Sequence, residues 1–150
     1  MPTHVALLRG INVGGRNRVA MADLRALVTS LTHTDVATYI QNGNVVFTST
    51  QTDTTAIAAA LEHAIAESLS VRPTVVVLSR DTLSRVVADN PYPDETTVLG
   101  HTLYLHTPDG LGRSELAAQL ARSGGPLAAA GSATVRNWAT VTKLLAMLSP

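Results

Sequence analysis

Residues 9–18 read RGINVGGRNR and connect a short apolar segment to the first expected helix. The loop holds three glycines, two asparagines and three arginines within ten residues. Glycine lets backbone N–H groups come close to an anion, and arginine binds phosphate or carboxylate oxygens through paired hydrogen bonds. The composition therefore favours an anion-binding loop beside a helix N-terminus. A sharp turn with solvated arginines is the alternative that the sequence leaves open.

The loop differs from the two common nucleotide-binding loops. Its glycines do not have the G-x-G-x-x-G spacing of a dinucleotide site, and no Lys-Ser or Lys-Thr pair follows them. The motif therefore predicts an anion without identifying it. The loop residues that we expect to contact a ligand are Arg9, Gly10, Asn12, Gly14, Gly15, Arg16 and Arg18.

Apolar spacing on both sides of the loop predicts the order strand, helix, strand, strand, helix, strand. Strands are expected at residues 4–8, 36–40, 45–49 and 74–78. The two helices are expected to bury one face each, formed by Leu24, Leu27, Val28 and Leu31 and by Ile57, Leu61, Ile65 and Leu69. This order predicts an α+β fold that begins with a ferredoxin-like βαββαβ plait, with helices on one face of the sheet. The β-branched run at 74–78 is typical of a strand buried on both faces.

The turn between the second and third strands is expected at Gln41-Asn42-Gly43-Asn44. An Asn-Gly pair is the sequence that a tight hairpin turn prefers. We expect this turn at the end of the sheet opposite to residues 9–18. Its asparagines are therefore not expected near Arg16.

Shorter elements are expected after residue 78. Ser79 is expected to cap a helix that buries Leu83, Val86 and Val87. A hairpin is expected around Gly100, and Ser114 is expected to cap a short helix. The last expected helix is capped by Asn137 and buries Trp138, Val141, Leu144, Leu145 and Leu148.

The composition excludes several classes of protein. The chain has 150 residues with eleven basic and eleven acidic side chains, so its net charge gives no argument about nucleic acid. It has no cysteine, which excludes disulfides and thiolate metal sites. No apolar run reaches the roughly 18 residues of a membrane helix, and the N-terminus lacks a signal-peptide pattern. We expect a cytoplasmic protein with no membrane contact.

Four segments together resemble the bacterial domain-of-unknown-function family 1697. They read ALLRGINVGGRNRV at 6–19, YIQNGNVVF at 39–47, LYLHTPDGLGRSEL at 103–116 and RNWATVTKLL at 136–145. They occur in the order of the family and span nearly the whole chain. The resemblance implies a soluble α+β domain of two ferredoxin-like halves, here residues 1–80 and a second, truncated half at 81–150. It implies no particular activity.

The chain departs from the family after Asn90-Pro91-Tyr92-Pro93, where members usually carry a further strand and helix. Only residues 94–100 separate this segment from the expected strand at 101–106. A truncated second half is expected to leave a sheet edge or an apolar face uncovered, and an uncovered edge can pair with another chain. We therefore expect a homodimer.

Two further helix starts add candidate ligand residues. In each, an arginine precedes a capping residue, so a guanidinium is expected beside free N–H groups of a helix. A lysine follows near Thr140, on what we expect to be a polar face. Capped helices with surface arginines are the alternative. The added candidates are Arg113, Ser114, Arg136, Asn137 and Lys143.

The sequence shows no catalytic or metal-binding constellation. His101 and His106 lie five residues apart on one expected strand, hence on opposite faces, and make a poor metal pair. We expect no metal and no cofactor. The leading prediction is binding of a small phosphorylated or carboxylated ligand, or of a nucleic-acid backbone, although one Phe, one Trp and three Tyr offer few rings for base stacking. A homodimeric structural protein is the second prediction, and an enzyme of phosphate-ester chemistry the third.

Overall fold

The computed structural model describes residues 2–12, 15–39, 43–88, 96–99, 102–105 and 138–148. By its internal contacts the chain divides into two compact units, residues 1–84 with 134–150, and residues 85–133. The predicted halves, residues 1–80 and 81–150, stay a prediction. None of the described helices is long and apolar enough to cross a membrane.

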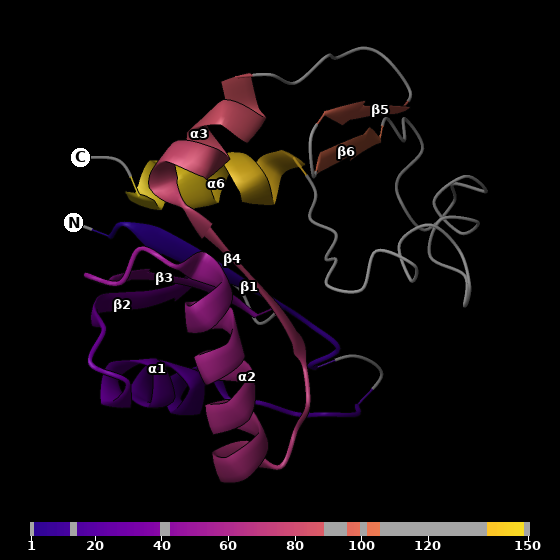
Figure 1. Cartoon of the computed structure of the whole chain (residues 1–150). Helices are drawn as coiled ribbons and strands as arrows, with labels where there is room; N and C mark the ends of the chain where they lie inside the picture. The colour runs from indigo at the N-terminus through magenta and orange to yellow at the C-terminus, as the bar shows by residue number, and fades with distance from the viewer. Residues whose placement is uncertain are drawn as a thin grey trace. The chain divides into compact units, whose positions relative to one another are not determined.

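The first unit is built on a four-stranded antiparallel sheet (Figure 1). Its strands are β1 (His4–Arg9), β2 (Thr34–Tyr39), β3 (Asn44–Thr48) and β4 (Thr74–Ser79), and their order is β2-β3-β1-β4. All three neighbouring pairs are antiparallel. The expected strands are confirmed, with ends that differ by one or two residues, and so is the mixed α+β class.

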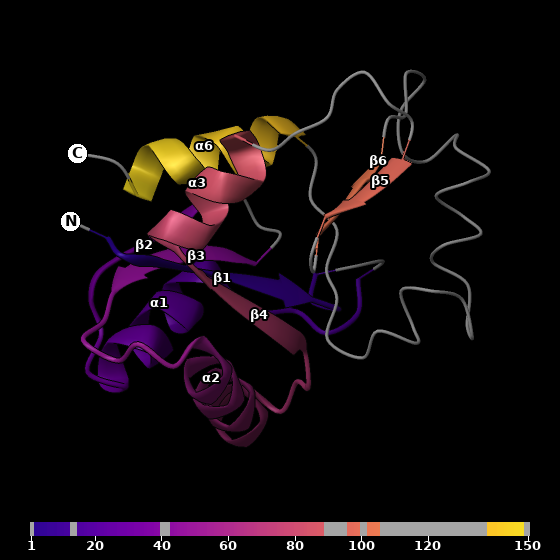
Figure 2. The ribbon, with the colours of Figure 1, turned by 45° about the horizontal axis from the view of Figure 1, so that its top comes forward.

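Helices α1 (Met21–Ser30) and α2 (Thr54–Leu69) cover one face of this sheet (Figure 2). Most of the helix residues with helical spacing are buried against strand residues, as predicted, whereas Leu31 and Leu69 are half-buried. This larger core contains Leu24, Leu27, Val28, Ile57, Leu61 and Ile65 from the helices and Ala6, Leu8, Val45, Phe47, Val75 and Val77 from the strands. Asp53 caps α2, because its carboxylate accepts a hydrogen bond of 3.1 Å from the backbone N–H of Ala56.

The second face of the sheet is covered by helices that follow the predicted plait, whereas α1 and α2 lie together on the first face, as expected. Helices α3 (Arg80–Ala88) and α6 (Trp138–Leu148) contribute Leu83, Leu144 and Leu148 to a second core with Val5, Leu7 and Val46. Successive strand residues point to opposite faces, so the apolar run of β1 requires cover on both. Thr140 is buried and does not lie on the polar face that we expected.

The start of α3 is capped as predicted. The Ser79 hydroxyl accepts a hydrogen bond of 3.2 Å from the backbone N–H of Thr82. Of the three apolar residues expected to be buried by this helix, Leu83 is buried and Val86 and Val87 are half-buried.

Strand β4 is an edge strand, not the strand buried on both faces that its β-branched run suggested. Val75 and Val77 are buried, whereas the alternate residues are only half-buried. The carboxylate of Glu62, on α2, accepts a hydrogen bond of 2.9 Å from the backbone N–H of Val75. At the other edge, the register of β2 shifts between Thr34 and Ala37, and Asp35 has a φ of 53°.

The second unit contains the hairpin of β5 (Thr96–Leu99) and β6 (Thr102–Leu105), which pair antiparallel. This confirms the hairpin expected around Gly100. The helix expected at Ser114 and the cap expected at Asn137 lie outside the described residues.

Candidate functional site

The turn between β2 and β3 lies at the same end of the sheet as the loop that follows β1. The backbone N–H of Leu8 donates to the carbonyl oxygen of Gly43 over 2.9 Å, and Leu7 pairs with Asn44. Because β1 and β3 are antiparallel, β3 begins where β1 ends. The prediction that placed this turn at the opposite end was therefore wrong.

Two asparagines hold the loop after β1 in shape. The Asn12 side chain accepts from the backbone N–H of Val19 over 2.8 Å and donates to the Val19 carbonyl over 3.0 Å. The Asn17 side chain donates to the Gly10 carbonyl over 2.9 Å, and the Asn12 N–H donates to the Asn17 carbonyl over 3.0 Å. Both asparagines have a positive φ, a conformation that Asn tolerates better than most residues. Asn12, expected to contact a ligand, thus supports the loop through its amide group.

Two apolar side chains fix the loop to the protein. Ile11 and Val19 are buried and belong to the larger core. Gly10 and Gly15 have φ values of 89° and 74°, which an L side chain rarely adopts. The loop is therefore held by its core contacts and by the hydrogen bonds of its asparagine side chains. Its charged side chains are left at the surface.

An open pocket lies where this loop enters α1. It has a volume of about 390 Å³ and is lined by Asn12, Gly15, Arg18, Val19 and Ala20. A Cβ placed on Gly15 would lie 3.8 Å from Nη2 of Arg18, so the guanidinium lies over this glycine. Ala20 is the N-cap of α1 and makes no side-chain capping hydrogen bond. The N-terminal N–H groups of α1 are thus not capped by the residue that usually caps them.

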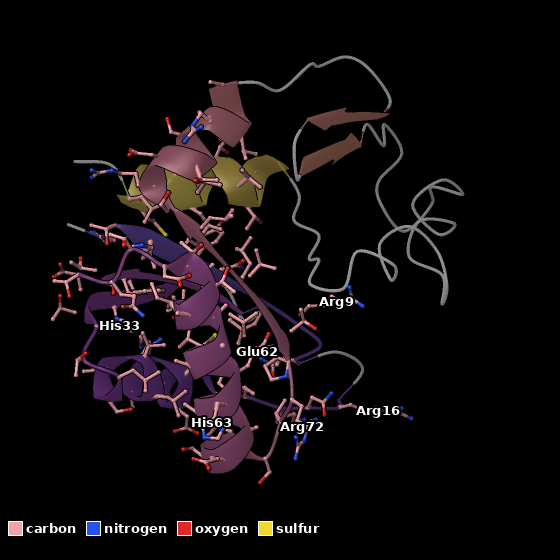
Figure 3. The ribbon with its side chains drawn as sticks, viewed as in Figure 1. Arg9, Arg16, His33, Glu62, His63 and Arg72 are labelled. Atoms are coloured by element: carbon pink, nitrogen blue, oxygen red, sulfur yellow. The ribbon has the colours of Figure 1, made fainter. Side chains whose placement is uncertain are left out.

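The described arginines of the loop are all exposed. Figure 3 shows Arg9 and Arg16 pointing away from the sheet on the same flank of the first unit. His63 and Glu67 form an ion pair on α2 over 3.3 Å, and among the described residues no ion pair joins Arg16 or Arg18 to a carboxylate. Arg16 and Arg18 therefore carry positive charge that no carboxylate of the described structure neutralises.

Arg72 adds an exposed cation that sequence reasoning missed. Arg9 pairs with Thr74 in the register of β1 and β4, which places Arg72 just beyond the end of β1 (Figure 3). The predicted order of strands could have placed Arg72 here, because a strand antiparallel to β1 must begin at the end where β1 stops. We call this end of the sheet, with Arg9, Arg16, Arg18 and Arg72, the arginine end.

One further candidate lies on a different element of the described structure. Lys143 is exposed on α6, which packs against the sheet face opposite to α1 and α2. The other candidates lie outside the described residues: Gly14, Arg113, Ser114, Arg136 and Asn137. No group of three or more metal-binding side chains occurs among the residues that are described.

The opposite end of the sheet holds a pair of buried histidines, and we call it the histidine end. The His4 ring stacks on Phe47 at 5.7 Å between centroids, and the His33 ring lies tilted against the same Phe47 at 4.7 Å. Thr3 forms a 2.7 Å hydrogen bond with Nδ1 of His4. Burial lowers the pKa of both histidines from the ordinary value of 6.5, and the nearby His33 lowers that of His4 further.

Fold and loop define a mixed α+β domain with an arginine-bearing loop at one end of its main sheet. A family model described as "Protein of unknown function (DUF1697)" matches residues 1–126. The chain belongs to this family, as the sequence motifs predicted. Three of the four motif segments lie within the match, and residues 136–145 lie beyond it.

The chain is also similar to the solved structure of the conserved bacterial protein SP0830 from Streptococcus pneumoniae. The TM-score is 0.74 at 22% sequence identity, over 99% of this chain and 99% of that chain. At this identity the likeness shows a shared fold. No curated protein matches the chain.

Proposed function

We propose that the protein binds an anion, a phosphate or carboxylate group, in the pocket where the glycine–arginine loop enters α1. The observation that carries this proposal is the joint presence of the Arg18 guanidinium and the N-terminus of α1 on one pocket. A helix N-terminus presents N–H groups and a partial positive charge, and both attract an anion. An exposed arginine adds a full charge with paired donors that match a phosphate or carboxylate.

The choice of residues around the pocket supports the same proposal. Gly15 lies beneath Arg18, and the position of its missing Cβ is 3.8 Å from the guanidinium, an ordinary van der Waals distance. Ala20 leaves the first N–H groups of α1 to another acceptor, whereas Asp53 caps α2 with its own carboxylate. An anion in the pocket would take the place of the missing cap.

A thermal-shift titration with inorganic phosphate tests the proposal. A ligand that binds only the native state stabilises it by about 2.7 kcal/mol at a hundredfold excess over its Kd. We expect this gain to shrink at high salt and to be lost in Arg18→Ala. Arg85→Ala is the matched control, because Arg85 is exposed on α3. An Arg18→Ala variant that phosphate stabilises as well as it stabilises the wild type would contradict the proposal.

The helix starts predicted at Arg113 and Arg136 are proposed as further contacts for the same anion. With them go Ser114 and Asn137. Arg136→Ala in the same titration tests their participation. An unchanged response to phosphate in that variant would restrict the site to the loop after β1.

We further propose that residues 1–80 form a ferredoxin-like plait and that residues 81–150 are a truncated second one, in a cytoplasmic protein. The strand order β2-β3-β1-β4, with α1 and α2 as the two crossover helices, supports this for the first half. An experimental structure in which residues 81–150 form no second plait would refute the second part.

A homodimeric structural role remains the alternative prediction. It requires no ligand, and the loop would then serve the fold alone. Sedimentation at several protein concentrations separates the two. A concentration-independent monomer that phosphate stabilises supports the binding protein, and a dimer that no anion stabilises supports the structural role.

A further inference from the structure

We propose that the arginine end forms an extended contact surface for the phosphodiester backbone of a nucleic acid, in which Arg72 acts together with Arg16 and Arg18. This inference rests on the proposed anion binding by the loop and extends it beyond one pocket. It assigns a role to Arg72, which belongs to the connection between α2 and β4.

The surface is assembled from segments far apart in the sequence. Arg16 and Arg18 belong to the loop after β1, and Arg72 precedes β4 by two residues. The loop is folded back on itself by the hydrogen bond from Asn12 N–H to the Asn17 carbonyl, so residues 16–18 stay beside the end of β1. The pairing of Arg9 with Thr74 brings the chain before β4 to the same end. Figure 3 shows Arg9, Arg16 and Arg72 along one flank.

The exposure of these arginines favours a long anion over a small one. Arg16, Arg18 and Arg72 are all exposed, and the pocket beside Arg18 is open. A small ligand is usually enclosed by the site that binds it. Separate, exposed guanidinium groups match a partner that carries one negative charge after another along its length. Glu62, an acid close to this surface, is occupied by its hydrogen bond to the backbone N–H of Val75.

A nucleic acid fits this surface better than an anionic membrane does. Proteins that bind at a membrane surface insert apolar side chains between the lipids. Among the described loop residues, the apolar Ile11 and Val19 are buried in the core and have no surface to insert. The described residues of the arginine end include no exposed aromatic ring for base stacking, since Tyr39 packs against the second core. The expected contact is therefore with phosphates and independent of base sequence.

The test is the fluorescence anisotropy of a labelled oligothymidylate, titrated with the full-length protein at several salt concentrations. Three arginine–phosphate contacts predict an affinity loss of about 20-fold for a fourfold rise in salt. Arg72→Ala is expected to weaken binding at low salt and to reduce that loss to about sevenfold, because one contact is removed. The control Arg85→Ala is expected to match the wild type. Inorganic phosphate and vesicles with anionic lipids serve as competing probes.

The outcomes separate this inference from the proposed function. Binding of the oligonucleotide with the expected salt dependence, weakened by Arg72→Ala, supports the extended surface. Stabilisation by phosphate through Arg18 without oligonucleotide binding overturns the inference and leaves the proposed function intact. Oligonucleotide binding that Arg72→Ala does not change, or binding of vesicles alone, also overturns it. A protein that binds neither phosphate nor oligonucleotide refutes both.

Discussion

The two ends of the four-stranded sheet use charge in opposite ways. At the arginine end, the side chains of Arg16 and Arg18 stand in solvent on a loop held by Asn12 and Asn17. At the histidine end, two titratable rings are buried against Phe47, and burial favours their neutral form. Charge kept in water costs little and stays available to a partner, whereas an ionisable group in the core ties stability to pH.

The largest effect is expected from removing the ring that both histidines contact. Phe47 is fully buried, and Phe47→Ala should lower the free energy of unfolding by about 4 kcal/mol, because it leaves a cavity. The pKa of both histidines should rise toward the ordinary value as their burial decreases. Chemical denaturation measures the first effect and NMR titration the second. A loss below about 1 kcal/mol would show that this end is not packed as described.

The next largest effect is expected at the arginine end, from Gly43→Ala. The new Cβ would lie 2.7 Å from the Leu8 Cβ, and the φ of 77° is unfavourable for alanine. Overpacking and backbone strain together predict a loss of about 3 kcal/mol. Gly10→Ala is the matched control, because its φ is 89° but nothing lies within 4 Å of the added Cβ. It should cost only about 1 kcal/mol, and equal losses in the two variants would rule out the close contact.

A third prediction concerns pH. The folded protein lowers the pKa of His4 and His33, so the unfolded chain takes up protons first as the pH falls through 6.5. Stability should therefore be complete above this pH and decrease below it, until the folded state is protonated as well. Urea titrations at a series of pH values measure the slope. His33→Gln should flatten it, because it removes one of the two buried rings, and an unchanged slope in that variant would contradict the prediction.

The smallest effects are expected from exchanging the caps of α1 and α2. Asp53→Ala should destabilise the protein by about 1 kcal/mol, since it removes the hydrogen bond to Ala56 N–H. Ala20→Asp should stabilise it by a similar amount, because it supplies the cap that α1 lacks. The new carboxylate should also weaken phosphate binding, because it occupies the same N–H groups. Phosphate binding that Ala20→Asp leaves unchanged would place the anion elsewhere.

The elements of the fold could be predicted from local patterns. The helical spacing of Leu24, Leu27 and Val28 identified the buried face of α1, and the Asn-Gly pair identified the turn that contains Gly43. Both signals act within a few residues, where the sequence alone determines the conformation. The packing of α6 on the second sheet face depends on contacts with β1 and β3, which are distant in the sequence. No local pattern predicts it.

The candidate site was predicted less completely than the fold. The arginines of the loop were identified by composition. Arg72 was missed, because the antiparallel pairing of β4 with β1 was not used to place the residues that precede β4. The same omission placed the turn of Gly43 at the wrong end. Asn12 was assigned to a ligand, and it both lines the pocket and hydrogen-bonds the loop's own backbone through its amide group. Residue type alone does not distinguish these two roles.

The hydrogen bond from the Val75 N–H to Glu62 has a consequence for how molecules of this protein meet one another. An exposed edge strand is a template on which further strands can add without limit. At β4 a carboxylate already occupies one of the positions that an incoming strand would need, and at β2 the irregularity near Asp35 interrupts the regular ladder. Addition of a strand from another molecule is therefore disfavoured at both edges of this sheet. Copies that associate are expected to do so through faces of the molecule instead of through continued strand pairing.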